Sequence, residues 1–134
     1  MHLIGILFLG NETVLIMDEP SPKPTFTAAQ AQGWSLDLRT VANRINHYNH
    51  KLAGYFYDVH YAIGPDQQFS GDPFELDEEY LRLMREQTNN PNYNIIEGLK
   101  VVLNNGNLVD EYIWSHGLKD YLEALLAKLE AEQN

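Results

Sequence analysis

The chain contains no cysteine, so disulfide bonds, thiolate catalysis and cysteine-ligated zinc sites are all excluded. This absence fits a reducing compartment. Long hydrophobic runs are also missing: the apolar opening MHLIGILFLGNE lacks a basic lead-in, and Glu12 interrupts it early. Such a stretch is typical of neither a signal peptide nor a membrane span. We therefore expect a cytoplasmic protein with no membrane partner.

Basic residues are scarce, since nine Lys and Arg stand against 19 Asp and Glu and give a net charge of −10. The excess is uneven, because residues 66–134 hold 14 carboxylates but only five Lys and Arg. Direct binding to nucleic-acid phosphates is not expected, since no basic surface is present to replace the counterions. The acidic half should instead attract basic proteins.

The usual motifs of catalysis and cofactor binding are absent from the sequence. The nine glycines are scattered singly, so no glycine-rich loop can cradle a phosphate. No serine lies in a nucleophile elbow, and the acidic cluster 72–79 lacks the calcium-loop pattern with its central glycine. We therefore predict no catalytic residue, no metal site and no cofactor.

A chain of 134 residues, 44% of them hydrophobic, predicts a single globular domain over residues 1–134. The apolar runs Leu3–Leu9 and Thr13–Met17 are separated by turn residues and predict an N-terminal β-hairpin. From residue 55 to residue 63 the hydrophobic period is two, which predicts a strand. Its more apolar face would carry Tyr55, Tyr57, Val59, Tyr61 and Ile63.

Three segments have the 3.6-residue period of helices. The first covers residues 35–52, with a start at Thr27 as an alternative and Gly54 as its expected C-cap. The second covers 73–88, after an N-terminal sequence Asp-Pro-Phe-Glu, and the third is the leucine-rich segment 117–131. The third helix would either pack in the core or form half of a homodimer seam, and a core position is favoured.

The segment 92–116 fits two structures. Asn105-Gly106 between two apolar runs favours a hairpin over 99–114, while a helix from Asn94 capped at Gly106, followed by a second short helix, is the alternative. The predicted fold class is therefore α+β. A small antiparallel sheet would contain the N-terminal hairpin, the 55–63 strand and the optional 99–114 hairpin, with about three helices covering it.

The segment HYNHKLAGYFYDVHY, residues 47–61, holds three of the five histidines and four of the eight tyrosines. Rigid rings with polar tips make adaptable contacts, so the predicted binding residues lie here. They are His47, His50, Tyr55, Tyr57, Asp58, His60 and Tyr61. The tyrosines fit either a core face or an aromatic platform for a partner.

The same segment offers a weak metal set, made of His47, His50, Asp58 and His60. On a helix with 100° per residue the first two histidines point away from the apolar stripe, so convergence of the four is not expected.

The sequence therefore favours a small, acidic, non-enzymatic binding or inhibitory protein that acts on a basic protein partner. Immunity proteins and accessory proteins of mobile elements have this kind of role. One alternative is a small-molecule-binding protein with a pocket lined by Tyr and His, and another is a metal-dependent or His/Asp hydrolase.

Overall fold

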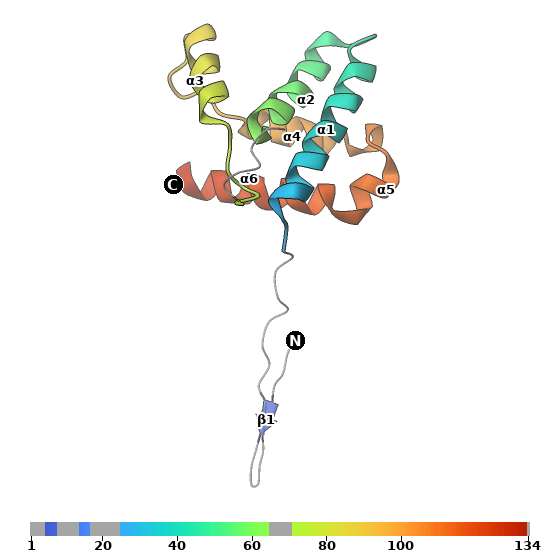
Figure 1. Cartoon of the computed structure of the whole chain (residues 1–134), viewed down its shortest axis with the longest axis vertical. Coiled ribbons are helices and arrows are strands. Elements are labelled where there is room, and N and C mark those ends of the chain that lie inside the picture. The colour runs from blue at the N-terminus through green and yellow to red at the C-terminus, as the bar shows by residue number, and fades with distance from the viewer. Residues whose placement is uncertain (1–4, 8–13, 17–24, 65–70, 134) are drawn as a thin grey trace.

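The structure is a computed structural model that describes residues 5–7, 14–16, 25–64 and 71–133. From residue 25 onward the described part of the chain is helical (Figure 1). The longer helices are α1 (Ala28–Ile45), α2 (His50–Ile63), α3 (Glu78–Gln87), α4 (Ile96–Asn104) and α6 (Lys119–Gln133). Between the last two lie η1 (Gly106–Leu108), α5 (Glu111–Ile113) and η2 (Trp114–Leu118).

The predicted α+β fold is wrong. The only strands among the described residues are β1 (Gly5–Leu7) and β2 (Val14–Ile16), which pair with each other in antiparallel register. They add no sheet to the helices, and most of the expected N-terminal hairpin lies outside the described residues. What the sequence predicted as a sheet covered by helices is a set of helices packed on one another.

The predicted strand 55–63 is part of helix α2. The Asn49 side chain caps this helix by accepting a hydrogen bond from the Leu52 amide at 3.1 Å. The buried side chains lie along one side of a helix rather than at every second residue; they are Ala53, Phe56, Val59, His60, Ala62 and Ile63. The alternating tyrosines favour a strand by their intrinsic propensity. The helix forms nevertheless, because it buries the other, more apolar residues of the segment in the core.

The favoured hairpin over 99–114 is also wrong, and the helical alternative is the observed structure. The Asn94 side chain accepts a hydrogen bond from the Ile96 amide at 2.9 Å just before α4 begins. At the other end Gly106 does not form a hairpin turn. It lies against the Trp114 indole, where a Cβ would come within 2.3 Å of the ring. Glycine is therefore required here by packing rather than by a strand-reversing turn.

The remaining helix boundaries differ from the prediction at their ends. Helix α1 begins after Thr27, which forms a capping box with Gln30, and stops at Ile45 rather than continuing to Leu52. Gly54 is consequently inside α2 and caps nothing. Helix α3 begins after Asp77, five residues later than the Asp-Pro-Phe-Glu sequence indicates. The leucine-rich C-terminal helix agrees with the prediction, as α6.

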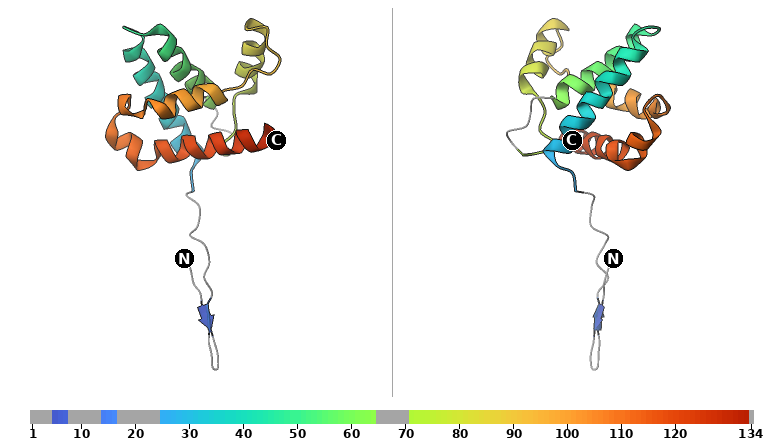
Figure 2. Two further views of the ribbon diagram at one scale, coloured as in Figure 1. Left: turned by 180° about the vertical axis from the view of Figure 1, so that it is seen from behind. Right: turned by 45° about the vertical axis from the view of Figure 1, so that its right-hand side comes forward.

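Helices α1 and α2 form an antiparallel pair, and α6 crosses beneath them (Figures 1 and 2). Helix α4 packs between α2 and α6, while α3 stands at the edge of the molecule beside α2. Fully buried Phe56, Leu99 and Leu122 come from three of these helices and lie in one core. Another face of α2 lies outside this core and contacts α3.

Candidate binding surface on helices α2 and α3

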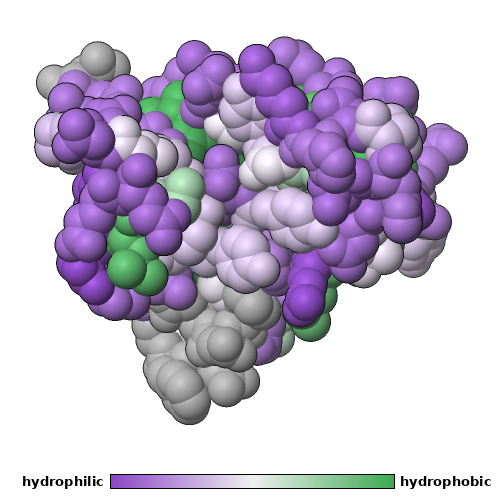
Figure 3. Space-filling view, turned by 90° about the horizontal axis from the view of Figure 1, so that it is seen from above, coloured by the Kyte–Doolittle hydropathy of each residue, from purple (hydrophilic) through white to green (hydrophobic). Residues whose placement is uncertain are grey.

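Three tyrosine rings stack along the boundary between α2 and α3. Tyr57 and Tyr61, one turn apart on α2, have ring centroids 6.3 Å apart, and Tyr61 lies 5.5 Å from Tyr80 of α3. Tyr61 is 43% exposed. From above, the surface is largely hydrophilic, with a paler central area and smaller hydrophobic patches (Figure 3). We call Tyr57, Tyr61 and Tyr80 the tyrosine stack; Tyr61 is its exposed member, while Tyr57 and Tyr80 are half-buried.

Asp58 lies next to the tyrosine stack and is tied to it. The Tyr80 hydroxyl donates a hydrogen bond to Asp58 Oδ1 at 2.8 Å, across the α2–α3 boundary. Burial raises the pKa of the Asp58 carboxyl, while the hydroxyl groups of Tyr80 and Tyr93 act in the opposite direction. Burial, together with the hydrogen bond to Asp58, also raises the pKa of Tyr80, so this phenol stays neutral.

A small pocket of about 250 Å³ opens between α2, α4 and the loop before α4. Asp58 and Glu97 supply its carboxylates, Tyr55 and Tyr93 supply its rings, and Gly98 forms part of the wall. Asn90, Asn92 and Asn94 complete the lining. The Tyr55 hydroxyl donates to Glu97 Oε2 at 3.5 Å. We call this the Asp58 pocket.

The seven predicted binding residues separate into four groups. Tyr55 and Asp58 line the Asp58 pocket, and Tyr57 and Tyr61 belong to the tyrosine stack. His60 is 1% exposed and faces α1, where its Nδ1 donates to the main-chain oxygen of Ser35 at 2.8 Å. Its role in the structure is to join two helices. His47 and His50 form the fourth group.

These two histidines lie at the turn between α1 and α2, where both are exposed. His50 begins α2 and pairs its Nδ1 with Asn46 Oδ1 at 2.5 Å. His60 follows ten positions later in the same helix, about 15 Å away along the axis. The described part of the chain contains no group of three or more His, Asp and Glu side chains placed to hold a metal ion.

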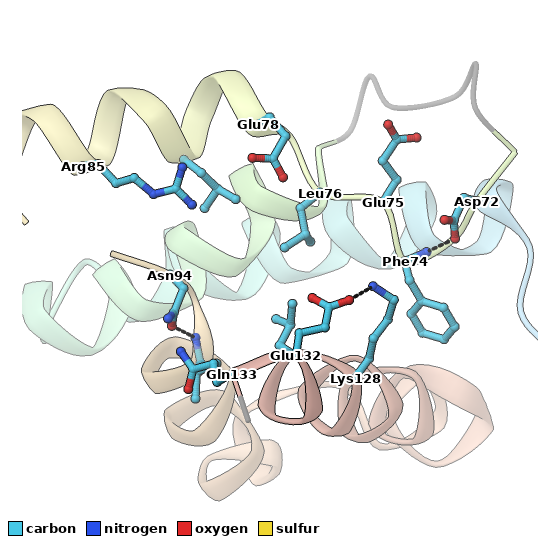
Figure 4. A pocket seen from close by; sticks show the side chains of 13 residues that line it. Asp72, Phe74, Glu75, Leu76, Glu78, Arg85, Asn94, Lys128, Glu132 and Gln133 are labelled. Carbon is cyan, nitrogen blue, oxygen red and sulfur yellow. Dashed lines mark hydrogen bonds and ion pairs between the residues drawn. The ribbon is translucent and has the colours of Figure 1, made fainter. Parts of the chain in front are cut away.

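A larger cleft of about 730 Å³ lies between α3, α6 and the segment that precedes α3. Figure 4 shows Leu76 and Phe74 beside it, with Arg85 on the α3 side. The ion pair between Lys128 and Glu132, 2.7 Å long, projects toward it from α6. Sequence analysis missed this cleft because its walls come from residues as far apart as 72 and 133.

No protein-family model, no curated protein and no solved structure matches this chain. Within the described ranges, no helix is long and apolar enough to cross a membrane.

Proposed function

We propose that this chain is an acidic helical protein-binding module that recognises a basic partner protein through the tyrosine stack. The observation that carries the proposal is the stack itself: three rings, one of them 43% exposed, gathered from two helices next to a carboxylate. Tyrosine is favoured at the energetic centres of protein interfaces because it buries a large area at little entropic cost.

The charge distribution supports a basic partner. Among the described residues of the acidic half, Arg82, Lys100 and Lys128 are each already paired with glutamates. The carboxylates outnumber these cations, so the net field around α3 and α6 is negative. Such a field speeds the encounter with a positively charged protein more than it tightens the final complex.

The proposal describes a binder or inhibitor in the cytoplasm, the compartment that the cysteine-free sequence leads us to expect. A small-molecule-binding function is the second candidate, because the α3–α6 cleft of about 730 Å³ lies in the usual size range of ligand pockets, roughly 300–1,000 Å³. It differs from the pocket expected from the sequence, since neither tyrosine nor histidine lines this cleft.

The test is quantitative capture from a lysate of the host with the immobilised full chain, in parallel with two variants. Tyr61→Ala removes the central ring of the tyrosine stack. Tyr48→Ala is the matched control, because Tyr48 is 67% exposed and lies outside the stack. We expect at least one basic protein to be enriched by the natural chain and by Tyr48→Ala but lost with Tyr61→Ala.

Once that protein is purified, its association rate constant should fall steeply as ionic strength rises, because steering acts between exposed charges that salt screens. Capture that is the same with both variants would show that the tyrosine stack is not the contact surface. A rate constant that does not depend on salt would refute the electrostatic part of the proposal.

A further inference from the structure

We infer that the Asp58 pocket receives the cationic end of a lysine or arginine side chain of the partner, an inference that rests on the proposed function. The pocket adjoins the tyrosine stack, since Asp58 lines the one and accepts a hydrogen bond from Tyr80 of the other. A partner lying on the stack would therefore have the pocket within reach of a single long side chain.

The hydrogen-bonding groups of the pocket match a cation. Tyr80 occupies only Oδ1 of Asp58, so the carboxylate retains acceptor capacity. The Tyr93 hydroxyl is buried and makes no well-aligned hydrogen bond to a described residue, although it lies near enough to Asp58 and Tyr80 to influence the pKa of Asp58. Burial and the nearby charge of Asp58 raise the pKa of Tyr93 to about 12, so the phenol is neutral and its oxygen can accept. An ammonium or guanidinium group would supply donors to both.

The charges also match. None of the eight lining residues is Lys or Arg, whereas Asp58 and Glu97 are both carboxylates. Burial raises the pKa of Asp58, and the opposing effect of the Tyr80 and Tyr93 hydroxyl groups does not cancel it. A bound cation would compensate the desolvated charge. It would also meet the rings of Tyr55 and Tyr93, which attract positive charge through their faces.

The size of the pocket fits one side chain rather than a larger ligand. Its volume of about 250 Å³ is below the range of drug-sized sites, roughly 300–1,000 Å³. Gly98 lets α4 approach α2 closely at this wall, because a Cβ there would be 3.4 Å from the Tyr55 main-chain oxygen and from Val59 Cγ2. Among the described residues, no third His, Asp or Glu side chain joins the carboxylates of Asp58 and Glu97 in a group that could hold a metal ion.

The first experiment is an NMR titration of the ¹⁵N-labelled full chain with n-butylammonium, which mimics a lysine side chain, and separately with n-propylguanidinium, which mimics arginine. The control ligand is 1-butanol, which has a similar shape and no charge. We expect saturable shifts confined to amides 55–58 and 93–98 with one or both cations and none with 1-butanol. Equal shifts with 1-butanol, or shifts spread without saturation over every acidic segment, would overturn the inference.

Three variants sharpen this titration. Asp58→Asn keeps the shape of the side chain and its hydrogen bond from Tyr80, and it should weaken binding of the cation at least tenfold. Glu111→Gln, a change at an exposed carboxylate on α5, is the matched control and should stay within twofold. Tyr93→Phe removes only the buried hydroxyl and should weaken binding severalfold. Unchanged affinity in Asp58→Asn and Tyr93→Phe would refute the assigned roles.

Partner capture separates this inference from the proposed function. If Tyr61→Ala abolishes capture while Asp58→Asn leaves it intact, the pocket inference is wrong and the binding function stands. If the cations bind as expected but Tyr61→Ala captures the same proteins as the natural chain, the proposed contact surface is wrong and the pocket is a cation site that serves another ligand.

Discussion

Replacing Ser35 by alanine tests how the buried histidine of α2 is held. Ser35 is fully buried on α1, and its hydroxyl donates to the main-chain oxygen of His60 at 2.7 Å. The same hydroxyl oxygen lies 2.9 Å from His60 Nδ1. Alanine removes this group and leaves the helix–helix contact otherwise unchanged. The variant therefore isolates one buried hydrogen bond between α1 and α2.

The expected cost is modest because both groups on His60 keep a second partner. The His60 main-chain oxygen also accepts from the Gly64 amide at 3.1 Å, and Nδ1 still donates to the main-chain oxygen of residue 35 at 2.8 Å. No buried polar group is orphaned. The loss should therefore be that of one hydrogen bond, about 1 kcal/mol, rather than the upper end of the desolvation penalty, about 3 kcal/mol.

The measurement is urea denaturation at pH 7.5, with Thr40→Ala as the control. Thr40 is on the same helix and is exposed, and its hydroxyl bonds only to the Leu36 oxygen at 3.2 Å. Because alanine raises helix propensity in both variants, the comparison between them largely removes that contribution. Ser35→Ala should be less stable than Thr40→Ala by about 1 kcal/mol. A difference near zero, or one above about 3 kcal/mol, would refute the reasoning.

Three further predictions concern the same helices. Burial lowers the pKa of His60 below 6.5, so the unfolded state binds the proton more readily than the folded state. The free energy of unfolding should therefore decrease as the pH is lowered through 6.5, and His60→Gln should flatten that decrease in urea titrations. Gly33→Ala should stabilise the protein by up to about 1 kcal/mol, because the new Cβ lies in open space on a helix. Gly117→Ala should instead lower the thermal midpoint sharply, because residue 117 has φ 140° and its new Cβ would lie 2.6 Å from the Trp34 ring. Asp77→Ala removes the cap of α3 and should cost about 1 kcal/mol, measurable as faster amide exchange in α3.

Part of the fold was predictable because it depends on local chemistry. Thr27 followed by Gln30 forms a capping box, and the leucines of α6 keep the helical period. In segment 92–116 the sequence allowed both the observed helices and a hairpin. The hairpin was favoured because Asn105-Gly106 is the commonest two-residue turn, but the glycine is there to accommodate Trp114. That contact is tertiary and has no local pattern.

The 55–63 segment shows where local pattern fails. Alternating tyrosines and a β-branched residue are typical of a strand, and nothing between residues 55 and 63 opposes that interpretation. The sequence does contain one indication of a helix, which is Asn49. Asparagine is a preferred N-cap residue, and its side chain accepts a hydrogen bond from the amide three residues later, here that of Leu52. The candidate site was predicted only in part for a related reason. Tyr80 lies 22 residues from Asp58, and only packing of α3 on α2 brings them together.

The change from strand to helix strengthens the argument for a binding surface. In a strand, Tyr57 and Tyr61 would share a face with Val59 and Ile63, which the structure buries. In helix α2 those two apolar residues enter the core, and the tyrosines one turn apart stack at its edge, with Tyr57 half-buried against the core and Tyr61 exposed. Rings fixed on a helix lose little freedom on binding, so loss of Tyr61 should act mainly on the dissociation rate of the partner. Loss of carboxylates around α3 should act mainly on the association rate of the partner. The tyrosine stack and the acidic residues are therefore expected to control different rate constants, and separate measurement of the two rates distinguishes their roles.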